Sequence, residues 1–173
     1  MAGGGREVVI DFEFFRGRQN ETVVKKLSVP SDNAAETFRF KSRYKMADHG
    51  SSENGLKWAD GHIEYKELHT VLTKAVAGFA HLYANGLSKC TFLAGLTGRP
   101  IHNLEDLECP PPVSFNHKRW CTLPCHKFPR FSCATKTTHC LYDWLMHYLR
   151  NKEYVQCPTD MIRHSATFVA ALE

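Results

Sequence analysis

The stretch Val-Val-Ile-Asp-Phe-Glu-Phe-Phe at residues 8–15 places two carboxylates two residues apart in an otherwise apolar run. Residues i and i+2 of a β-strand lie on the same face, so Asp11 and Glu13 are predicted to point the same way. At a rise of roughly 3.3 Å per residue, their backbones lie about 7 Å apart. Like charges this close in a half-buried sheet raise one pKa unless a cation neutralises them. The pair therefore predicts either a divalent-metal site for phosphoryl chemistry or a polar strand face that meets solvent or nearby Lys and Arg.

The size and composition of the chain are those of one globular domain. Its 173 residues are enough to bury a substantial core, and 43% of them are hydrophobic. We expect a flexible N-terminus at 1–7, one domain at 8–151, and a C-terminal extension at 152–173 that packs on the domain or is partly mobile. The net charge of +4 is compatible with a nucleic-acid partner but does not by itself indicate one.

The cysteines and the absence of long apolar runs bear on the compartment. The first residues have no apolar core of the kind found in signal peptides, and no apolar run approaches transmembrane length. Seven cysteines without an export signal favour reduced thiols and metal ligation over disulfides. A cytoplasmic or nuclear protein without a membrane partner is expected.

Hydrophobic periodicity gives a coarse order of elements. Alternating or short apolar runs predict strands, three- and four-residue steps predict helices, and Gly98 is a predicted helix end. The predicted strands are 8–15, 22–29, 36–44, 79–84 and 101–104, and the predicted helices are 63–77, 88–96 and 133–151. This order predicts an α/β fold with a mixed sheet flanked by helices, and with 8–15 as its central strand.

A Cys- and His-rich segment precedes the last predicted helix. Cys121, Cys125, His126 and Cys133 lie within 13 residues of a Pro-bearing stretch that has no periodicity. Zinc prefers four tetrahedral N, S or O ligands, and four protein ligands make a closed structural site. Such a metal would fasten the loop to the helix start. The alternative is that these small side chains pack in the core, and the neighbouring Cys109 and His117 could replace a ligand.

The third predicted strand carries a row of cations. Arg39, Lys41, Arg43 and Lys45 alternate with apolar residues and are predicted to share one face. Cations spaced in this way can follow a phosphate backbone, and each contact adds a salt-dependent increment of affinity. A solvated face whose charges prevent edge pairing is the alternative.

The order of elements and the first strand resemble the DEDD-type, DnaQ-like 3′–5′ exonucleases of the ribonuclease H-like fold. That family carries Asp-x-Glu on its first strand, here Asp11 and Glu13, a second Asp after a middle strand, and His-x-Ala-x-x-Asp at the last helix. Residues 82–89 contain no Asp, and residues 132–137 carry Ser and Thr in place of His and Asp. Asp106 or Asp143 could restore a third carboxylate only if the fold places it against the first strand. The resemblance thus implies a degenerate nuclease rather than an active one, with at most weak Mg²⁺ or Mn²⁺ binding.

The chain also resembles the Maelstrom domain, a ribonuclease H-like fold that has lost the exonuclease carboxylates. The likeness covers most of residues 8–150 and is carried by 82–107, by Trp-Cys-Thr-Leu-Pro-Cys-His at 120–126 and by Cys-Ala at 133–134. It implies a zinc site in which an upstream Glu, here Glu13, joins the Cys/His cluster. The family spaces its Cys and His by two residues, whereas Leu123 lies three before His126, so either Cys121 or Cys125 takes that place.

Three functions follow as expectations from these observations. The first is a non-catalytic or weakly active module that binds single-stranded RNA or DNA; the Maelstrom resemblance implies small-RNA (piRNA) silencing of transposons, or a protein encoded by a mobile element. The second is an active Mg²⁺- or Mn²⁺-dependent 3′–5′ exonuclease. The third is a protein-interaction module with no nucleic-acid contact. No small-molecule substrate is expected.

Overall fold

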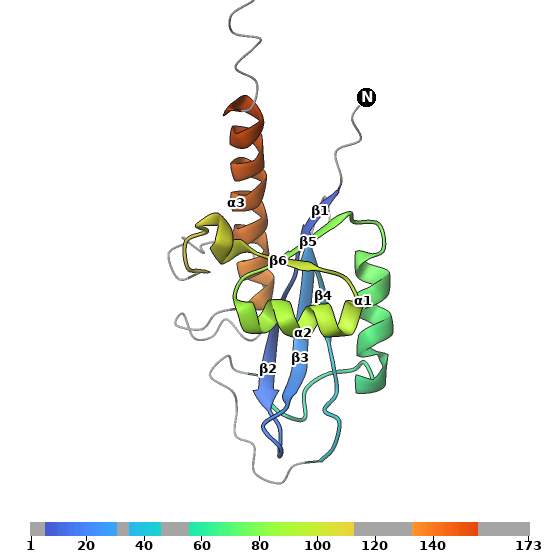
Figure 1. The fold of residues 1–173 in the computed structure, drawn as a ribbon. Coiled ribbons are helices and arrows are strands. Elements are labelled where there is room, and N and C mark those ends of the chain that lie inside the picture. Colours follow the sequence, from blue (N-terminus) through green and yellow to red (C-terminus); the bar gives the residue numbers. More distant parts are fainter. Residues whose placement is uncertain (1–5, 31–34, 46–55, 113–132, 156–173) are drawn as a thin grey trace, which may run out of the picture. The chain divides into compact units, whose positions relative to one another are not determined.

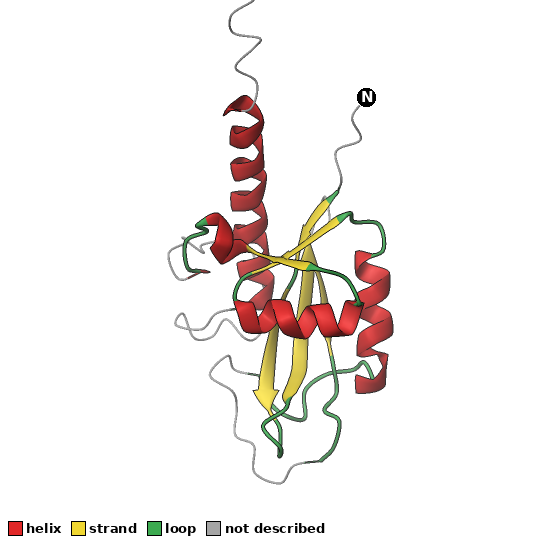
Figure 2. Cartoon of the chain, viewed as in Figure 1, coloured by secondary structure: helices red, strands yellow, loops and turns green. Residues whose placement is uncertain are grey.

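The computed structural model describes residues 6–30, 35–45, 56–112 and 133–155, which form a mixed α/β fold with one parallel and one antiparallel sheet flanked by helices (Figures 1 and 2). The chain divides into two compact units, Met1–Tyr142 and Asp143–Glu173. The strands are β1 (Glu7–Val9), β2 (Asp11–Arg16), β3 (Thr22–Pro30), β4 (Ala35–Arg39), β5 (His81–Ala84) and β6 (Ile101–Asn103). The helices are α1 (Leu68–Val76), α2 (Leu87–Thr97) and α3 (Ala134–Val155), with short 3₁₀ turns η1 (Tyr65–Glu67) and η2 (Leu104–Leu107).

The predicted first strand is divided between the two sheets. β1 pairs in parallel with β5, and β5 pairs in parallel with β6. After Ile10, whose N–H still donates to the carbonyl of Tyr83 at 2.8 Å, β2 turns to pair antiparallel with β3, and β3 pairs with β4. The stretch 8–15 therefore joins the parallel and antiparallel sheets instead of running as one unbroken strand.

One face of these sheets is apolar and carries α1 and α2. The buried core contains Val8, Ile10 and Phe12 from the joining strands. Leu68, Leu72 and Val76 from α1 and Cys90 and Leu93 from α2 pack in the same cluster. This is the alternation expected of strands with one buried apolar face, and it leaves the intervening residues Asp11 and Glu13 on the other face.

Local signals in the sequence explain where α2 begins and ends. Gly86 precedes the helix with φ +101°, and its N–H donates to Asn103 Oδ1 at 2.9 Å. Gly98 ends the helix in the left-handed region with φ +64°, and its N–H donates to the carbonyl of Ala94 at 2.9 Å. Glycine adopts this conformation without a steric cost, so the predicted C-terminal cap at Gly98 is confirmed.

A connecting segment is fastened to the antiparallel sheet by a buried lysine. β3 bulges opposite β2 between the Glu13 and Phe14 pairs, which leaves Lys25 as the extra residue. Its ammonium donates to the carbonyl of Trp58 at 2.9 Å and to that of Asp60. Burial lowers the pKa of Lys25 to about 8. The bulge thus permits two consecutive lysines, Lys25 and Lys26, to be buried in separate environments.

The observed elements match the predicted order and differ at their ends. The helix predicted at 63–77 begins as a 3₁₀ turn and becomes α-helical at Leu68. The strand predicted at 36–44 ends at Arg39, although Phe40 forms an isolated bridge with Ile63. The Cys- and His-rich segment 113–132 lies outside the described residues.

The second unit is described over residues 143–155, which continue α3. The rings of Trp144 and Tyr148 stack with centroids 5.1 Å apart, and the Lys152 ammonium lies 4.9 Å from the centroid of the Tyr148 ring. Among the described helices, none has the length and apolar character needed to cross a membrane.

Candidate functional site

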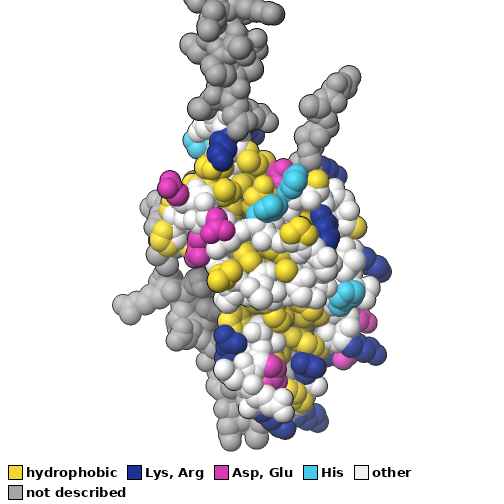
Figure 3. Space-filling view, in the orientation of Figure 1, with side chains coloured by type: hydrophobic (Ala, Val, Ile, Leu, Met, Phe, Trp, Pro, Cys, Tyr) yellow, Lys and Arg dark blue, Asp and Glu magenta, His cyan; other side chains and the backbone are white. Residues whose placement is uncertain are grey.

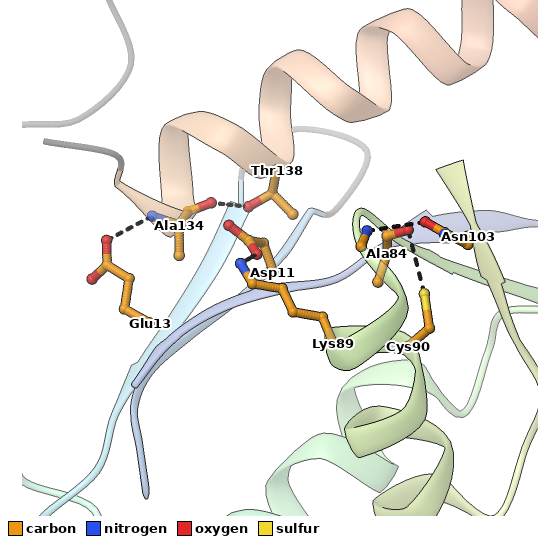
Figure 4. A network of polar contacts seen from close by, with 9 residues as sticks. Asp11, Glu13, Ala84, Lys89, Cys90, Asn103, Ala134 and Thr138 are labelled. Atoms are coloured by element: carbon orange, nitrogen blue, oxygen red, sulfur yellow. Dashed lines mark hydrogen bonds and ion pairs between the residues drawn. The ribbon is translucent and has the colours of Figure 1, made fainter. Parts of the chain in front are cut away.

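The acidic pair lies on a buried polar face of the antiparallel sheet. Asp11 and Glu13 are each only 5% exposed. The strand register places Ser28 opposite Asp11 and Lys26 opposite Glu13. The first residue of α3, Ala134, donates its N–H to Glu13 on this face (Figure 4), and the preceding Cys133 accepts from Lys26. The prediction that the two carboxylates share a face is met, and the face is enclosed by protein groups.

Asp11 forms an ion pair with a lysine from α2. The Lys89 ammonium contacts Asp11 Oδ1 (Figure 4), and 27% of the Lys89 side chain is exposed against 6% of that of Asp11. The same ammonium lies 5.4 Å from the centroid of the Phe12 ring. Burial raises the pKa of Asp11 above its ordinary value, and the charge of Lys89 opposes part of that rise. The counter-charge of Asp11 is therefore an ammonium group.

Glu13 is held by the start of α3. Its Oε1 accepts a hydrogen bond from the backbone N–H of Ala134 at 2.9 Å (Figure 4). A carboxylate at a helix N-terminus satisfies a backbone donor that has no partner within the helix. The other oxygen, Oε2, is buried without a hydrogen-bond partner among the described residues. Burial raises the pKa of Glu13 to about 7, while Lys26 and the Ala134 N–H act in the opposite direction.

A second lysine and a cysteine complete the cluster. Lys26 is fully buried, and its ammonium donates to Cys133 Sγ at 3.0 Å. Cys133 directly precedes α3 and is 3% exposed. One turn further on, the hydroxyl of Thr138 donates to the carbonyl of Ala134. We call the set Asp11, Glu13, Lys26, Lys89 and Cys133 the buried polar cluster.

The charges of the buried polar cluster balance without a metal. Two carboxylates face two ammonium groups, so the cluster lacks the excess negative charge that holds two catalytic cations about 4 Å apart. Within the described ranges, no group of three or more His, Cys, Asp and Glu side chains is placed to hold a metal ion. The cluster joins β2, β3, α2 and the start of α3 by an ion pair and hydrogen bonds.

Part of the predicted zinc site falls within this cluster. Glu13 and Cys133 are brought together by two contacts: the N–H of Ala134, next to Cys133, binds the Glu13 carboxylate, and Lys26, opposite Glu13 on β3, donates to Cys133 Sγ. Cys121, Cys125, His126 and His117 lie outside the described residues. A buried carboxylate oxygen without a partner beside a thiol is a donor pair that zinc accepts. Glu13 and Cys133 are thus the two predicted zinc ligands that the described residues bring together.

The remaining candidate ligands lie elsewhere. Asp106 is in η2. Burial raises the pKa of the Cys90 thiol, and the nearby charge of Asp106 adds to that rise. Asp143 lies in α3 within the second unit. The thiol of Cys109 contacts the carbonyl of Pro110, and burial raises its pKa to about 11.

The predicted basic row is only partly exposed. Lys41, Arg43 and Lys45 are exposed beyond the end of β4, as alternation predicts. Arg39 is only partly exposed, and its Nε is buried without a hydrogen-bond partner among the described residues. Lys41 forms an exposed ion pair with Glu64. The cations at 41, 43 and 45 therefore remain as the candidate surface.

Sequence reasoning missed the two lysines of the buried polar cluster, although each had a signal. Lys25-Lys26 interrupts the apolar run of the second predicted strand, and buried lysines generally need a partner. Lys89 ends the segment 82–89, in which the exonuclease resemblance calls for an Asp. An acidic pair on one strand and unexplained lysines on neighbouring elements could have been joined into one hypothesis.

Comparison with models of known protein families, with curated proteins and with solved structures finds no match for this chain.

Proposed function

We propose that this chain is a non-catalytic module with a ribonuclease H-like scaffold that binds single-stranded nucleic acid. The observation that supports the proposal is the Lys89–Asp11 ion pair. In the exonuclease arrangement that the sequence resembles, the acid on the first strand holds a metal, and the segment 82–89 supplies another acid. Here that segment supplies a lysine instead, so the change converts metal binding into an internal ion pair.

Lys26 extends the same argument to the second carboxylate. Its buried ammonium opposes the rise in the pKa of Glu13, and the N–H of Ala134 binds Oε1 of that carboxylate. A module built in this way keeps the nuclease scaffold and replaces its ions with protein groups. Its exposed cations at 41, 43 and 45 are then available for phosphate. The Maelstrom resemblance extends the proposal to small-RNA silencing of transposons, or to a protein encoded by a mobile element.

Binding and cleavage are measured in one assay. A labelled single-stranded oligonucleotide is incubated with the protein and Mn²⁺, and its anisotropy and length are followed. The proposal predicts salt-sensitive binding of an intact strand. Shortening that is lost in Asp11→Ala would establish the exonuclease alternative, and no binding even at 25 mM salt would favour a protein-interaction module.

We further propose one structural zinc bound by Glu13, Cys133, His126 and either Cys121 or Cys125. The support is the buried, unpartnered oxygen of Glu13 beside the Cys133 thiol. Protein purified without added zinc should contain about one zinc per chain. Cys133→Ser should lose it, and a zinc-free wild type with normal stability would end the proposal.

A further inference from the structure

Two grooves of the first unit meet at one arginine. The first groove has a volume of about 880 Å³, and its lining includes Arg18, Lys41, Arg43, Tyr44, Lys45 and Trp58. The second has a volume of about 480 Å³, and its lining includes Arg43, Tyr65, Lys66, His69, Phe92 and Leu96. Arg43 lines both, so the two grooves adjoin, and we call them together the double groove.

The two halves of the double groove differ in character. The first half is dominated by cations, with Arg18, Lys41 and Lys45 beside Arg43. The second has apolar and aromatic walls from α1 and α2, with cations at its rim. Figure 3 shows hydrophobic side chains gathered just below α2, with Lys and Arg side chains nearby. A charged channel beside an apolar recess suits a ligand that alternates anionic and flat apolar groups.

The arginines of the double groove are held in position by aromatic rings. The guanidinium of Arg18 lies 4.8 Å from the centroid of the Tyr44 ring, and that of Arg43 lies 5.5 Å from the centroid of the Tyr65 ring. Arg18 also donates to the carbonyl of Lys45 at 2.8 Å. Stacking fixes the plane of a guanidinium while its edge can still donate to phosphate. These side chains therefore lose less conformational entropy on binding an anion.

The rings that carry the arginines are themselves anchored. The indole N–H of Trp58 donates to the carbonyl of Tyr44 at 2.8 Å, and the hydroxyl of Tyr44 donates to Glu21 at 2.7 Å. The hydroxyl of Tyr65 accepts from the N–H of Val24 at 3.2 Å. The rings thus belong to the fold and do not need to be ordered by the ligand.

Acidic side chains cancel only part of the positive charge. Glu64 pairs with Lys41. The pKa of Glu21 is lowered mainly by the hydrogen bond from the Tyr44 hydroxyl and to a small extent by the charge of Arg43, so this carboxylate also lies near the groove. Arg18 and Lys45 add two further charges in the first half. The surface therefore remains positive and complements an anionic ligand.

We propose that the double groove binds single-stranded nucleic acid, with phosphates on Arg18 and Arg43 and a base in the recess beside His69 and Phe92. The inference rests on the proposed function and names its surface. A base has a flat apolar face that an aromatic recess accepts whatever the sequence, and cations follow its backbone. A duplex would keep its bases stacked inside and could not fill the recess.

The test measures the anisotropy of labelled 20-nucleotide oligouridine and oligothymidine with the full chain, from 50 to 200 mM salt. Each lost phosphate contact lowers the slope of log affinity against log salt by about 0.7. If variant and wild type bind equally at 1 M salt, the variant then binds about eightfold more weakly than wild type at 50 mM salt. Arg18→Gln and Arg43→Gln should each show this loss. Arg6→Gln is the matched control, because that exposed arginine is also stacked, 5.6 Å from the Phe79 ring centroid, but does not line the grooves.

A second variant separates the base from the phosphate. His69→Ala should weaken binding about fivefold or more while leaving the salt slope unchanged, because a base contact releases few counterions. Stronger binding of oligouridine than of oligothymidine would assign RNA, and the reverse would assign DNA. Circular dichroism confirms that each variant is folded.

The outcomes separate this inference from the proposed function. If wild type binds and the groove arginines behave like Arg6→Gln, the double groove is wrong while nucleic-acid binding stands. If wild type binds neither strand at low salt, the proposed function fails as well. Binding of poly-glutamate as tight as that of the oligonucleotides would overturn the inference in favour of an acidic peptide.

Discussion

Replacing Glu13 by Gln tests the buried polar cluster through its pH dependence. The ordinary pKa of this carboxyl is 4.5, and burial raises it to about 7. Between these values the folded chain binds the proton more tightly than the unfolded chain. The free energy of unfolding that this group contributes is therefore greatest below pH 4.5 and falls as the pH rises through 7. At about 1.4 kcal/mol for each pH unit, the loss amounts to about 3 kcal/mol.

The Glu13→Gln variant removes the ionisable group and keeps the size and shape of the side chain. The amide Oε1 can still accept from the N–H of Ala134, so the start of α3 retains its partner. Lys26 keeps the surroundings it has in wild type below pH 7, because the amide is neutral like the protonated Glu13 carboxyl. The difference in unfolding free energy between wild type and Glu13→Gln should thus change by about 3 kcal/mol between pH 4 and pH 8, to the disadvantage of wild type.

Urea unfolding of protein dialysed against EDTA, followed by far-UV circular dichroism at several pH values, provides the measurement, because zinc bound to Glu13 would hold that carboxyl ionised. Glu36→Gln on β4 is the control, because it makes the same substitution at an exposed position. A difference that is flat with pH, or in which wild type gains on the variant as the pH rises, would refute the reasoning. The second result is expected if a metal ion held Glu13 in its ionised form.

Three further predictions concern other parts of the fold. Lys89→Met should lower the unfolding free energy at pH 7 by about 2 kcal/mol, because it strands the buried carboxylate of Asp11 although Lys89 itself is partly exposed; unchanged stability would contradict the ion pair. Gly61→Ala should cost about 1–3 kcal/mol, since φ is +118° and the new Cβ would lie 2.2 Å from a backbone oxygen, whereas Gly78→Ala meets nothing within 4 Å and should be neutral or mildly stabilising in thermal unfolding. Cys109, whose pKa is about 11, should resist iodoacetamide at pH 8 in the folded protein and react once unfolded in urea, as site-resolved mass spectrometry would show; equal rates in both states would contradict its burial.

The elements could be predicted because their signals are local. The three- and four-residue apolar steps of α1, the glycine that ends α2 and the alternation of Ile10, Phe12 and Phe14 depend only on neighbours in sequence. The break after Ile10 could not be predicted, because it depends on β1 and β2 choosing partners in different sheets. The end of β4 at Arg39 also depends on tertiary contacts, since Phe40, whose N–H still donates to the carbonyl of Lys25, forms only an isolated bridge with Ile63.

Of the candidate site, the sequence predicted the two carboxylates, Asp11 and Glu13, but not the two lysines that contact this cluster, Lys26 and Lys89. The spacing of Asp11 and Glu13 is enough to place both on one face. Their partners depend on the bulge that lets Lys26 reach Cys133 and on the approach of Lys89 from α2, 78 residues away in sequence. Contacts between residues so far apart in sequence depend on the tertiary fold, so the periodicity within one segment cannot predict them.

The central claim is that ammonium groups take the place of catalytic metal ions at Asp11. Electron paramagnetic resonance of free Mn²⁺, titrated into wild type and Asp11→Ala at pH 7.5, tests it directly, because any sites elsewhere in the chain are common to both proteins. If Lys89 occupies the place of a metal, the two proteins have the same Mn²⁺ binding isotherm. A Mn²⁺ site present in wild type and lost in Asp11→Ala would contradict it.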